Sequence, residues 1–281
     1  MADEILSLLN ELAASHTEIN LLNVYKGVPI SFTAQIVGFQ GMSMKVRTDQ
    51  RQTVCMFFEK KTFIQSKGLT EIYQAEVTDL DPIDRVATLA NFNRVVSGVG
   101  NRVLVRVQPK GSLESNVKNQ YSDNIVQGEL ADISQNGLAI YLPLEIFSPR
   151  LYCKDASVTV TLRLPGVYEP RPSKTGPSPL GKSTGRLSRE IVRFPFVNKP
   201  AAKPSEGEAN PQSLENPLIG IHGIVVNTYL DQSKGCYRIG MRILEDDPSR
   251  AFITQFIAQR QKEIIGEIKA MYDLMIKDVE K

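Results

Sequence analysis

The stretch Asp132-Ile133-Ser134-Gln135-Asn136-Gly137 lies between an apolar run that ends at Ile133 and a second run that begins at Leu138. Asn-Gly is a strong turn signal, and Asp and Ser side chains satisfy the backbone of turns. The six residues therefore predict a β-hairpin whose two strands fall at 125–133 and 138–142. The pattern on either side of the hairpin indicates the kind of β structure to which it belongs.

Short β-branched and aromatic runs, separated by turn residues, continue in both directions. Before the hairpin they predict strands at 28–37, 42–47, 53–58, 71–77 and 85–90. Around and after it they predict further strands at 102–107, 157–164, 220–229 and 236–243. Even spacing of this kind is typical of a small barrel or sandwich. We expect one such domain over residues 18–97 and a second, antiparallel one over residues 102–246.

The N-terminal end carries a helical pattern. Apolar residues at Ile5, Leu8, Leu9 and Leu12 predict an amphipathic helix within residues 1–17. Its polar face is acidic, so we expect it to dock on a neighbouring domain or subunit and not on an anionic membrane surface.

A long helix is predicted over residues 247–281, with Asp247 as its N-cap and Pro248 in its first turn. One stripe of this helix is apolar, and it comprises Ile253, Ile257, Ile264, Ile268, Met271 and Met275. A helix of about 30 residues spans about 45 Å, which exceeds the length of a small β domain. Part of it should contact another domain or a second copy of the chain, which would give a homo-oligomer.

Two segments interrupt the β pattern. The sequence Ser97-Gly98-Val99-Gly100-Asn101 places two glycines between apolar runs, so residues 98–101 are predicted to link the domains as a hinge. Residues 165–217 hold 10 of the 16 prolines, which predicts a basic insertion without regular structure in the second domain. Within it, residues 189–197 are apolar enough to pair with a sheet edge or to dock.

Composition narrows the class of protein. A formal charge of +2 on 281 residues argues against broad electrostatic binding to DNA or RNA. The cysteines Cys55, Cys153 and Cys236 suit reduced thiols packed as small hydrophobes, and two histidines, His16 and His222, cannot build a zinc site or a catalytic cluster. The sequence has no run of about 20 apolar residues that could span a membrane, and its first residues are acidic where a signal peptide would be basic. A cytoplasmic globular protein is therefore expected.

Arg102 and Arg106 lie four residues apart, directly after the hinge. In a strand the two arginine side chains would lie on the same face. Such a pair fits two interpretations, a solvated strand face and an anion-binding site. Guanidinium groups bind phosphate bidentately and match the O6/N7 edge of guanine. In the hairpin, Asp132 could accept from the N–H edge of a guanine, and Ser134 could bond a phosphate or a base. Gly137 would allow a close approach of backbone.

Together, Arg102-x-x-x-Arg106 and Asp132-x-Ser134-x-x-Gly137 resemble, at every position, the signature of the PilZ family of cyclic di-GMP receptors. Residues 221–243 are similar to that family's closing strands and residues 252–261 to its C-terminal helix. The preceding β-rich region is similar to the N-terminal domain of its flagellar-brake (YcgR-like) members. The resemblance covers residues 18–265 apart from the insertion. Asn101 stands where relatives often carry a further basic residue, which leaves open whether one or two ligand molecules bind.

The resemblance implies a mainly β protein with an N-terminal split-barrel-like domain and a C-terminal PilZ barrel. It implies a receptor and not an enzyme, with cyclic di-GMP as ligand and neither cofactor nor metal. Arg102 and Arg106 would wrap the ligand and contact phosphate and guanine, while Asp132, Ser134 and Gly137 would hold the base and the ribose-phosphate. The signal would reach motility, attachment or polysaccharide control through a rearrangement of the domains and an unidentified protein partner. The alternative is a PilZ-like interaction module that acts through its C-terminal helix without nucleotide binding.

A second motif competes with this interpretation. Residues 176–183, Gly-Pro-Ser-Pro-Leu-Gly-Lys-Ser, match the P-loop pattern G-x-x-x-x-G-K-[ST]. A working P-loop needs a buried strand before it, but the preceding residues are too rich in proline for a central strand. Pro177 and Pro179 also remove two of the amides that would bind phosphate. We therefore interpret the match as a coincidence, with a nucleotide hydrolase that uses Lys182 as the disfavoured third class.

Overall fold

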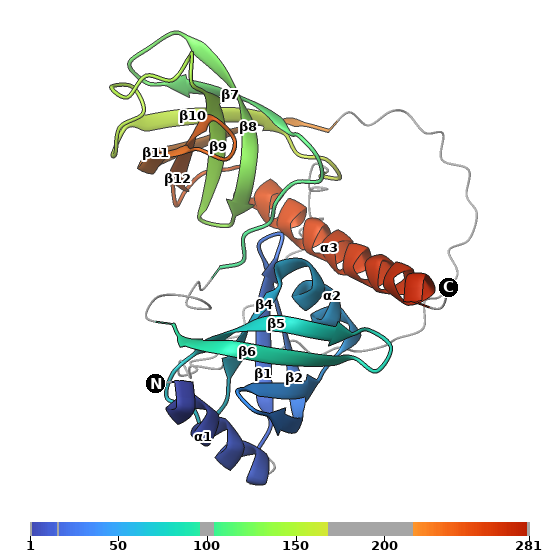
Figure 1. Cartoon of the computed structure of the whole chain (residues 1–281). Coiled ribbons are helices and arrows are strands. Elements are labelled where there is room, and N and C mark those ends of the chain that lie inside the picture. The colour runs from blue at the N-terminus through green and yellow to red at the C-terminus, as the bar shows by residue number, and fades with distance from the viewer. Residues whose placement is uncertain (1, 16, 96–103, 168–215, 280–281) are drawn as a thin grey trace, which may run out of the picture.

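The computed structural model describes residues 2–15, 17–95, 104–167 and 216–279 of the chain. Two β-barrels lie one above the other in Figure 1, and the C-terminal helix runs from the upper barrel to the side of the lower one. The mainly β class predicted from the sequence, with two barrels and a helix at each end, is confirmed. The predicted hinge at 98–101, Arg102, and residues 168–215 of the predicted insertion lie outside the described residues.

The N-terminal barrel is a closed sheet. In barrel order its strands are β1 (Ile19–Tyr25), β2 (Val28–Gln40), β3 (Ser43–Arg47), β6 (Val86–Arg94), β5 (Tyr73–Asp81) and β4 (Lys61–Gln65). The sequence pattern located β2, β3, β5 and β6 but missed β1 and β4. Helix α1 (Ala2–Ala14) buries Ile5, Leu9 and Leu12 in one cluster with barrel side chains. The predicted docking of this helix therefore takes place on the barrel that follows it.

Helix α2 (Gln50–Glu59) occupies the segment that the sequence predicted as a strand at 53–58, so that prediction is wrong. The β-branched and aromatic residues of the segment favour a strand by propensity alone. The ends of the segment favour a helix instead. The Asp49 carboxylate accepts from the Arg51 amide at 2.9 Å, and Lys60 ends the helix in the left-handed conformation with a φ of 55°.

The C-terminal barrel is a second closed sheet. In barrel order its strands are β10 (Ser157–Arg163), β11 (Leu218–Asp231), β12 (Cys236–Ile243), β9 (Gly137–Pro143), β8 (Ile125–Ser134) and β7 (Glu114–Asn119). The sequence predicted all of them except β7. The prediction of a strand at 102–107 is wrong for residues 104–107, which the structure describes. Residues 104–106 are irregular, and Val107 forms an isolated bridge to Ile133.

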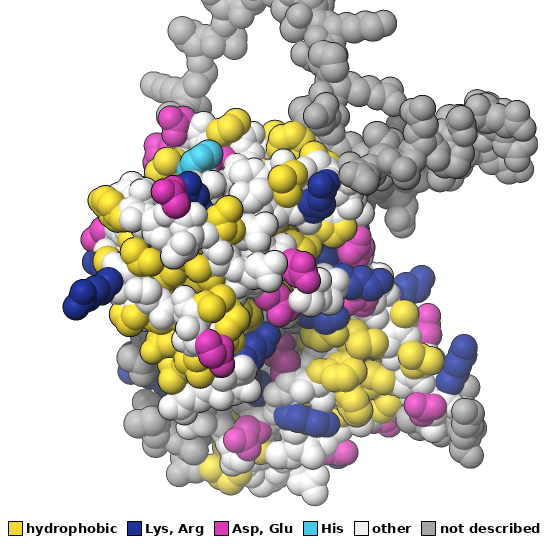
Figure 2. Space-filling model, turned by 90° about the horizontal axis from the view of Figure 1, so that it is seen from above, with side chains coloured by type: hydrophobic (Ala, Val, Ile, Leu, Met, Phe, Trp, Pro, Cys, Tyr) yellow, Lys and Arg dark blue, Asp and Glu magenta, His cyan; other side chains and the backbone are white. Residues whose placement is uncertain are grey.

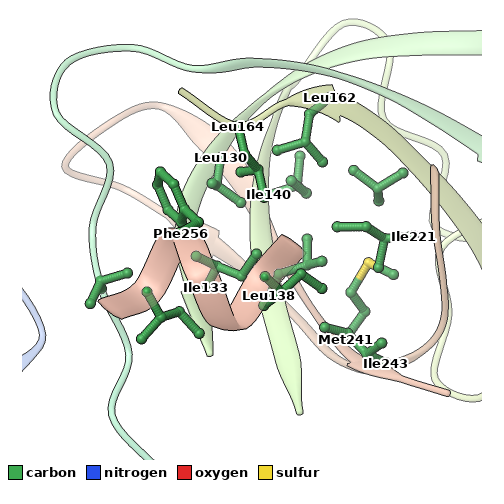
Figure 3. Close-up of a cluster of buried hydrophobic side chains, with 14 of the residues drawn as sticks. Leu130, Ile133, Leu138, Ile140, Leu162, Leu164, Ile221, Met241, Ile243 and Phe256 are labelled. Atoms are coloured by element: carbon green, nitrogen blue, oxygen red, sulfur yellow. The ribbon is translucent and has the colours of Figure 1, made fainter. Parts of the chain in front are cut away.

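Helix α3 (Arg250–Val279) closes one end of the C-terminal barrel with its first turns. Phe256 is only 3% exposed, and Figure 3 shows it in the barrel's apolar cluster beside Leu130 and Leu164. The helix starts later than predicted. Asp247 is not its N-cap but accepts from the Ser249 amide at 2.8 Å, just before the first helical turn.

The second half of α3 packs against α2 and the N-terminal barrel. Ile264 and Ile268 are fully buried in one apolar cluster with Val54 of α2 and with Val28 and Ile30 of β2. One continuous apolar cluster therefore extends from the C-terminal barrel along α3 to α2 and the start of β2, whereas the interior of the N-terminal barrel forms a separate cluster. The apolar stripe predicted for this helix is covered by the chain's own domains, which confirms that part of the helix contacts another domain.

The surface agrees with the near-neutral composition. Figure 2 shows acidic and basic side chains interspersed on the face that is seen from above. Within the described ranges, no helix is long and apolar enough to cross a membrane. Of the three cysteines, all unpaired, Cys55 is buried as expected but Cys153 is exposed, so the prediction of a core thiol is wrong for Cys153. Burial raises the pKa of the Cys55 thiol to about 12, which keeps it protonated.

Replacing Phe256 by Ala should lower the free energy of unfolding of the C-terminal barrel by about 3–5 kcal/mol, because a large aromatic side chain leaves a cavity in a closed barrel end. Leu274→Ala on the same helix is the control, since Leu274 is 60% exposed. Urea unfolding followed by circular dichroism measures both variants. Equal shifts of the unfolding midpoint would contradict the assigned role of Phe256.

Candidate functional site

Arg106 lies on an irregular segment that crosses the C-terminal barrel beside β8. The neighbouring Val107 is fully buried and exchanges two backbone hydrogen bonds with Ile133, at 2.9 and 3.0 Å. Successive side chains of a paired segment point to opposite sides, so the burial of Val107 turns Arg106 outward. The Arg106 side chain is 41% exposed, and its Nη1 lies 3.6 Å from Oδ1 of Asp132 on β8.

A second arginine, which the sequence analysis did not predict, holds Asp132 from the other side. Arg238 on β12 donates from Nη2 to Asp132 Oδ2, and its guanidinium carbon lies 5.7 Å from the ring centroid of Tyr229. The two paired side chains are only 13% and 15% exposed. Burial alone would lower the pKa of Arg238, but the Asp132 carboxylate and the Tyr229 hydroxyl together outweigh it and raise that pKa. Arg238 is therefore a fixed positive charge in the floor of the site.

The remaining carboxylate oxygen of Asp132 is an unused acceptor. Oδ1 is buried and has no hydrogen-bond partner among the described residues. Nη1 of Arg106, at 3.6 Å, is too distant for a hydrogen bond. Buried carboxylate oxygens normally accept at least one hydrogen bond, so this oxygen needs an explanation.

Ser134 and Gly137 shape the end of the hairpin. The Ser134 hydroxyl donates to the Gly137 carbonyl at 2.9 Å, across the turn formed by Gln135 and Asn136. The hairpin is confirmed, but the turn precedes Gly137, which is not among the residues with positive φ. A Cβ at Gly137 would lie 2.6 Å from the carbonyl oxygen of Met241 on β12. The absence of a side chain at Gly137 therefore allows the backbone of the neighbouring strand β12 to lie close to it.

The structure thus brings three of the relevant side chains together, from a loop, from β8 and from β12. They are Arg106, Asp132 and Arg238. Ser134 and Gly137 lie at the end of the same β8–β9 hairpin, whereas Arg102 and the P-loop match at 176–183 fall outside the described residues. Across the described ranges, no cluster of three or more potential metal ligands is found. The only sequence signal for Arg238 was a basic residue inside the apolar closing strand.

The segment that carries Arg106 also contacts the N-terminal barrel. The β1–β2 turn reaches it through Lys26, whose carbonyl accepts from the Gln108 amide at 3.2 Å. At the next residue, Gly27 with a φ of 84°, any Cβ would clash with the carbonyl oxygen of Arg106. The backbone of the site and the tip of a hairpin in the other domain are therefore in direct contact.

Helix α3 completes this junction. Arg260, only 2% exposed, donates to the Gln108 carbonyl at 2.9 Å and to Glu267 at 2.8 Å. Glu267 also accepts from Lys26 at 2.6 Å. Burial alone would raise the pKa of the Glu267 carboxyl, but hydrogen bonds from Arg260 and Lys26 hold it below its ordinary value. The junction is thus a charged network that links α3, the β1–β2 turn and the segment of the site.

No family model and no curated protein matches this chain in sequence, whereas solved structures align with most of its length. It is similar to the K. pneumonia MrkH–c-di-GMP complex, at 12% identity over 95% of this chain and 97% of that one, with a TM-score of 0.40. It is also similar to Escherichia coli YcgR in complex with c-di-GMP, at 9% identity over 96% and 95%, with a TM-score of 0.36. A third is the Bacillus subtilis inhibitor of motility MotI/DgrA, at 9% identity over 88% and 97%, with a TM-score of 0.34. YcgR is the type of protein that the sequence resemblance named.

Asp132→Ala should destabilise the C-terminal barrel by about 1–3 kcal/mol, because it leaves the mostly buried Arg238 without its carboxylate. The control is Asp123→Ala, which removes a fully exposed carboxylate that pairs with Lys118 on the same barrel. Thermal and urea unfolding should show a loss for the first variant and no measurable change for the second. Equal stability of the two variants would show that the Asp132–Arg238 pair is not a structural element of the site.

Proposed function

We propose that this chain is a receptor for cyclic di-GMP, bound by Arg102, Arg106, Asp132, Ser134 and Gly137. The observation that carries the proposal is the buried Oδ1 of Asp132, which has no hydrogen-bond partner in the described structure and lies beside a half-exposed arginine. Such a pair offers a hydrogen-bond acceptor and a cation to one and the same ligand.

The chemistry of a guanine nucleotide fits this pair. The Watson–Crick edge of guanine presents N–H donors, which a carboxylate oxygen accepts, and its O6/N7 edge presents acceptors for a guanidinium. Oδ1 of Asp132 would gain the hydrogen bond that it lacks, which removes the cost of a buried and unsatisfied acceptor. Arg106 would turn from its distant contact with Asp132 to a phosphate or to the second edge of the base.

The other residues take supporting roles. Arg102, four positions before Arg106, adds a second guanidinium for the phosphates, as the family resemblance implies. Ser134 and Gly137 keep the hairpin in the shape that presents Asp132, since the Ser134 hydroxyl closes the turn at 2.9 Å and Gly137 permits the contact with β12. Arg238 forms the close ion pair with Asp132 and neutralises its charge. The positive charge of Arg106 is then free to interact with the ligand.

The proposed role is that of a receptor without a chemical step, which relays its signal to motility, attachment or polysaccharide control. The relay is a reorientation of the two barrels. A ligand that draws Arg106 toward itself moves the backbone against which Lys26 and Gly27 of the other barrel pack. A ligand shifts such an equilibrium only by its differential affinity for the two arrangements, and contacts through Arg106 provide that difference.

The alternative, an interaction module that acts through the C-terminal helix alone, draws less support from the structure. The apolar stripe that would bind a partner is packed inside the chain, with Ile264 and Ile268 fully buried. Leu274, which is 60% exposed, is an apolar residue near the end of α3 through which two copies could pair. We therefore place the first function of α3 in joining the barrels and retain homo-oligomer formation as a secondary role.

Calorimetry with cyclic di-GMP tests the site. Arg106→Ala should weaken binding by about 2–3 kcal/mol, roughly 30- to 150-fold, because one charged and bidentate contact is lost. Arg94→Ala removes the same charge from the N-terminal barrel, where Arg94 pairs with Glu71, and should bind as the unaltered chain does. Full-affinity binding by a folded Arg102→Ala/Arg106→Ala variant would overturn the assignment.

The relay is tested by substituting two glycines that share a left-handed backbone conformation. Gly27 and Gly41 both have positive φ, 84° and 57°, but a Cβ would clash with Arg106 only at Gly27 and would meet nothing at Gly41. Gly27→Ala should therefore lower the affinity for cyclic di-GMP and change the distance between labels on the two barrels, whereas Gly41→Ala should only reduce stability. Unchanged affinity and interdomain distance in Gly27→Ala would exclude a relay through this contact.

A further inference from the structure

A polar cavity lies in the N-terminal barrel, away from the candidate site around Asp132. Its volume is about 430 Å³, and it opens between the end of α1, the residues just before β1, the middle of β2 and the end of β3. Figure 1 shows α1 at the end of this barrel that faces away from the C-terminal barrel. The volume lies within the range of small-molecule sites.

Two arginines bring their charge to this cavity. Arg47 is the last residue of β3 and pairs with Val86 of β6, and Arg85 is the residue just before Val86. Neither forms an ion pair with a carboxylate among the described residues, whereas Arg51 and Arg94 of the same barrel do.

The balance of charge in the cavity is positive. Glu18 is the one acidic residue among those that line it, so the two guanidiniums leave an excess of one positive charge. Both arginines are exposed to solvent and therefore accessible to a ligand that arrives from outside.

A buried hydroxyl without a partner is the second independent observation. Thr48 lines the cavity, is only 7% exposed, and its Oγ1 is buried without a hydrogen-bond partner in the described ranges. Native structures rarely leave a buried hydroxyl unpaired unless a ligand or an ordered water bonds it. The Thr48 amide donates to the Arg85 carbonyl at 3.1 Å, so the same residue also holds the arginine in place.

Arg85 occupies a backbone position that is unfavourable for it. Its φ of 55° lies in the left-handed region, where glycine or asparagine costs less than a long side chain. The side chain at this position lines the cavity together with Arg47.

We propose that this cavity binds the phosphate group of a small molecule. The two guanidiniums can donate in forks to phosphate oxygens, and their excess of one positive charge over Glu18 favours an anion. Thr48 would donate its unused hydroxyl, whereas the Thr33 hydroxyl already donates to Asn20 at 3.3 Å and the Thr17 hydroxyl is hydrogen-bonded to that of Ser15 at 2.8 Å. Ala34 and Ile36 give the cavity an apolar side on which a small organic body would rest. This second site does not depend on the proposed cyclic di-GMP site.

Amide NMR with inorganic phosphate tests the proposal in the full chain. The background is Arg102→Gln/Arg106→Gln, which removes the other arginine pair, and ionic strength is held constant with chloride. The amides of Thr33, Thr48 and Arg85 should shift and saturate with a dissociation constant of about 1–10 mM. Acetate, which carries one charge and two oxygens, should bind roughly tenfold more weakly.

Matched substitutions separate a site from a general salt effect. Arg47→Gln/Arg85→Gln should abolish the saturable shift, and Thr48→Val should weaken it. Lys45→Gln, which removes a charge two residues earlier on the same strand and outside the cavity lining, should leave it unchanged. Shifts that fail to saturate, that persist in the double variant, or that are equal for acetate would overturn the proposal.

Discussion

The backbone from Arg106 to Gln108 is the element on which the arrangement of the molecule depends, because three separate parts of the fold bond to it. Val107 pairs with Ile133 of the C-terminal barrel, and the amide of Gln108 donates to Lys26 of the N-terminal barrel. The carbonyl of Gln108 accepts from Arg260 of α3. A buried arginine is tolerated only when it is paired and hydrogen-bonded, which ties Arg260 to Glu267 and hence to Lys26.

The hydrophobic core follows the same route as these polar contacts. Phe256 closes the C-terminal barrel, and Ile264 and Ile268, further along the same helix, are buried against α2 and β2. A helix that packs into both barrels limits their relative motion to arrangements that keep its apolar stripe covered. The segment of the site and α3 are thus two connections in parallel between the barrels, of which only the first contacts the proposed ligand. The free energy of ligand binding at Arg106 would therefore act on the weaker, polar connection, which is the segment of the site.

Residue runs, turn signals and helical periodicity predicted most of this fold, and they failed where the ends of an element or long-range pairing decide its structure. Strands β8, β9 and β12 were predicted from β-branched and aromatic runs between turn residues, and the stripe of α3 was predicted because burial on one helix face leaves a period in the sequence. Helix α2 was missed because its residues favour strands, whereas Asp49 and Lys60 at its ends favour a helix. Arg238 was missed for another reason: its partner Asp132 is 106 residues away, a separation that no local motif can show.

The two arginines contact Asp132 unequally, which a purely structural ion pair would not require. Were both guanidiniums bonded closely to the carboxylate, each oxygen would be satisfied, and a ligand would have to break two charged hydrogen bonds to enter. Here Arg238 is 13% exposed and bonds Oδ2, whereas Arg106 is 41% exposed and stays 3.6 Å from Oδ1. One arginine thus cancels the charge of Asp132 and fixes its geometry, which leaves the second charge and one oxygen in excess. An excess of one cation and one acceptor, held in place before any ligand arrives, would let the proposed guanine nucleotide bind without first breaking the barrel's own ion pair.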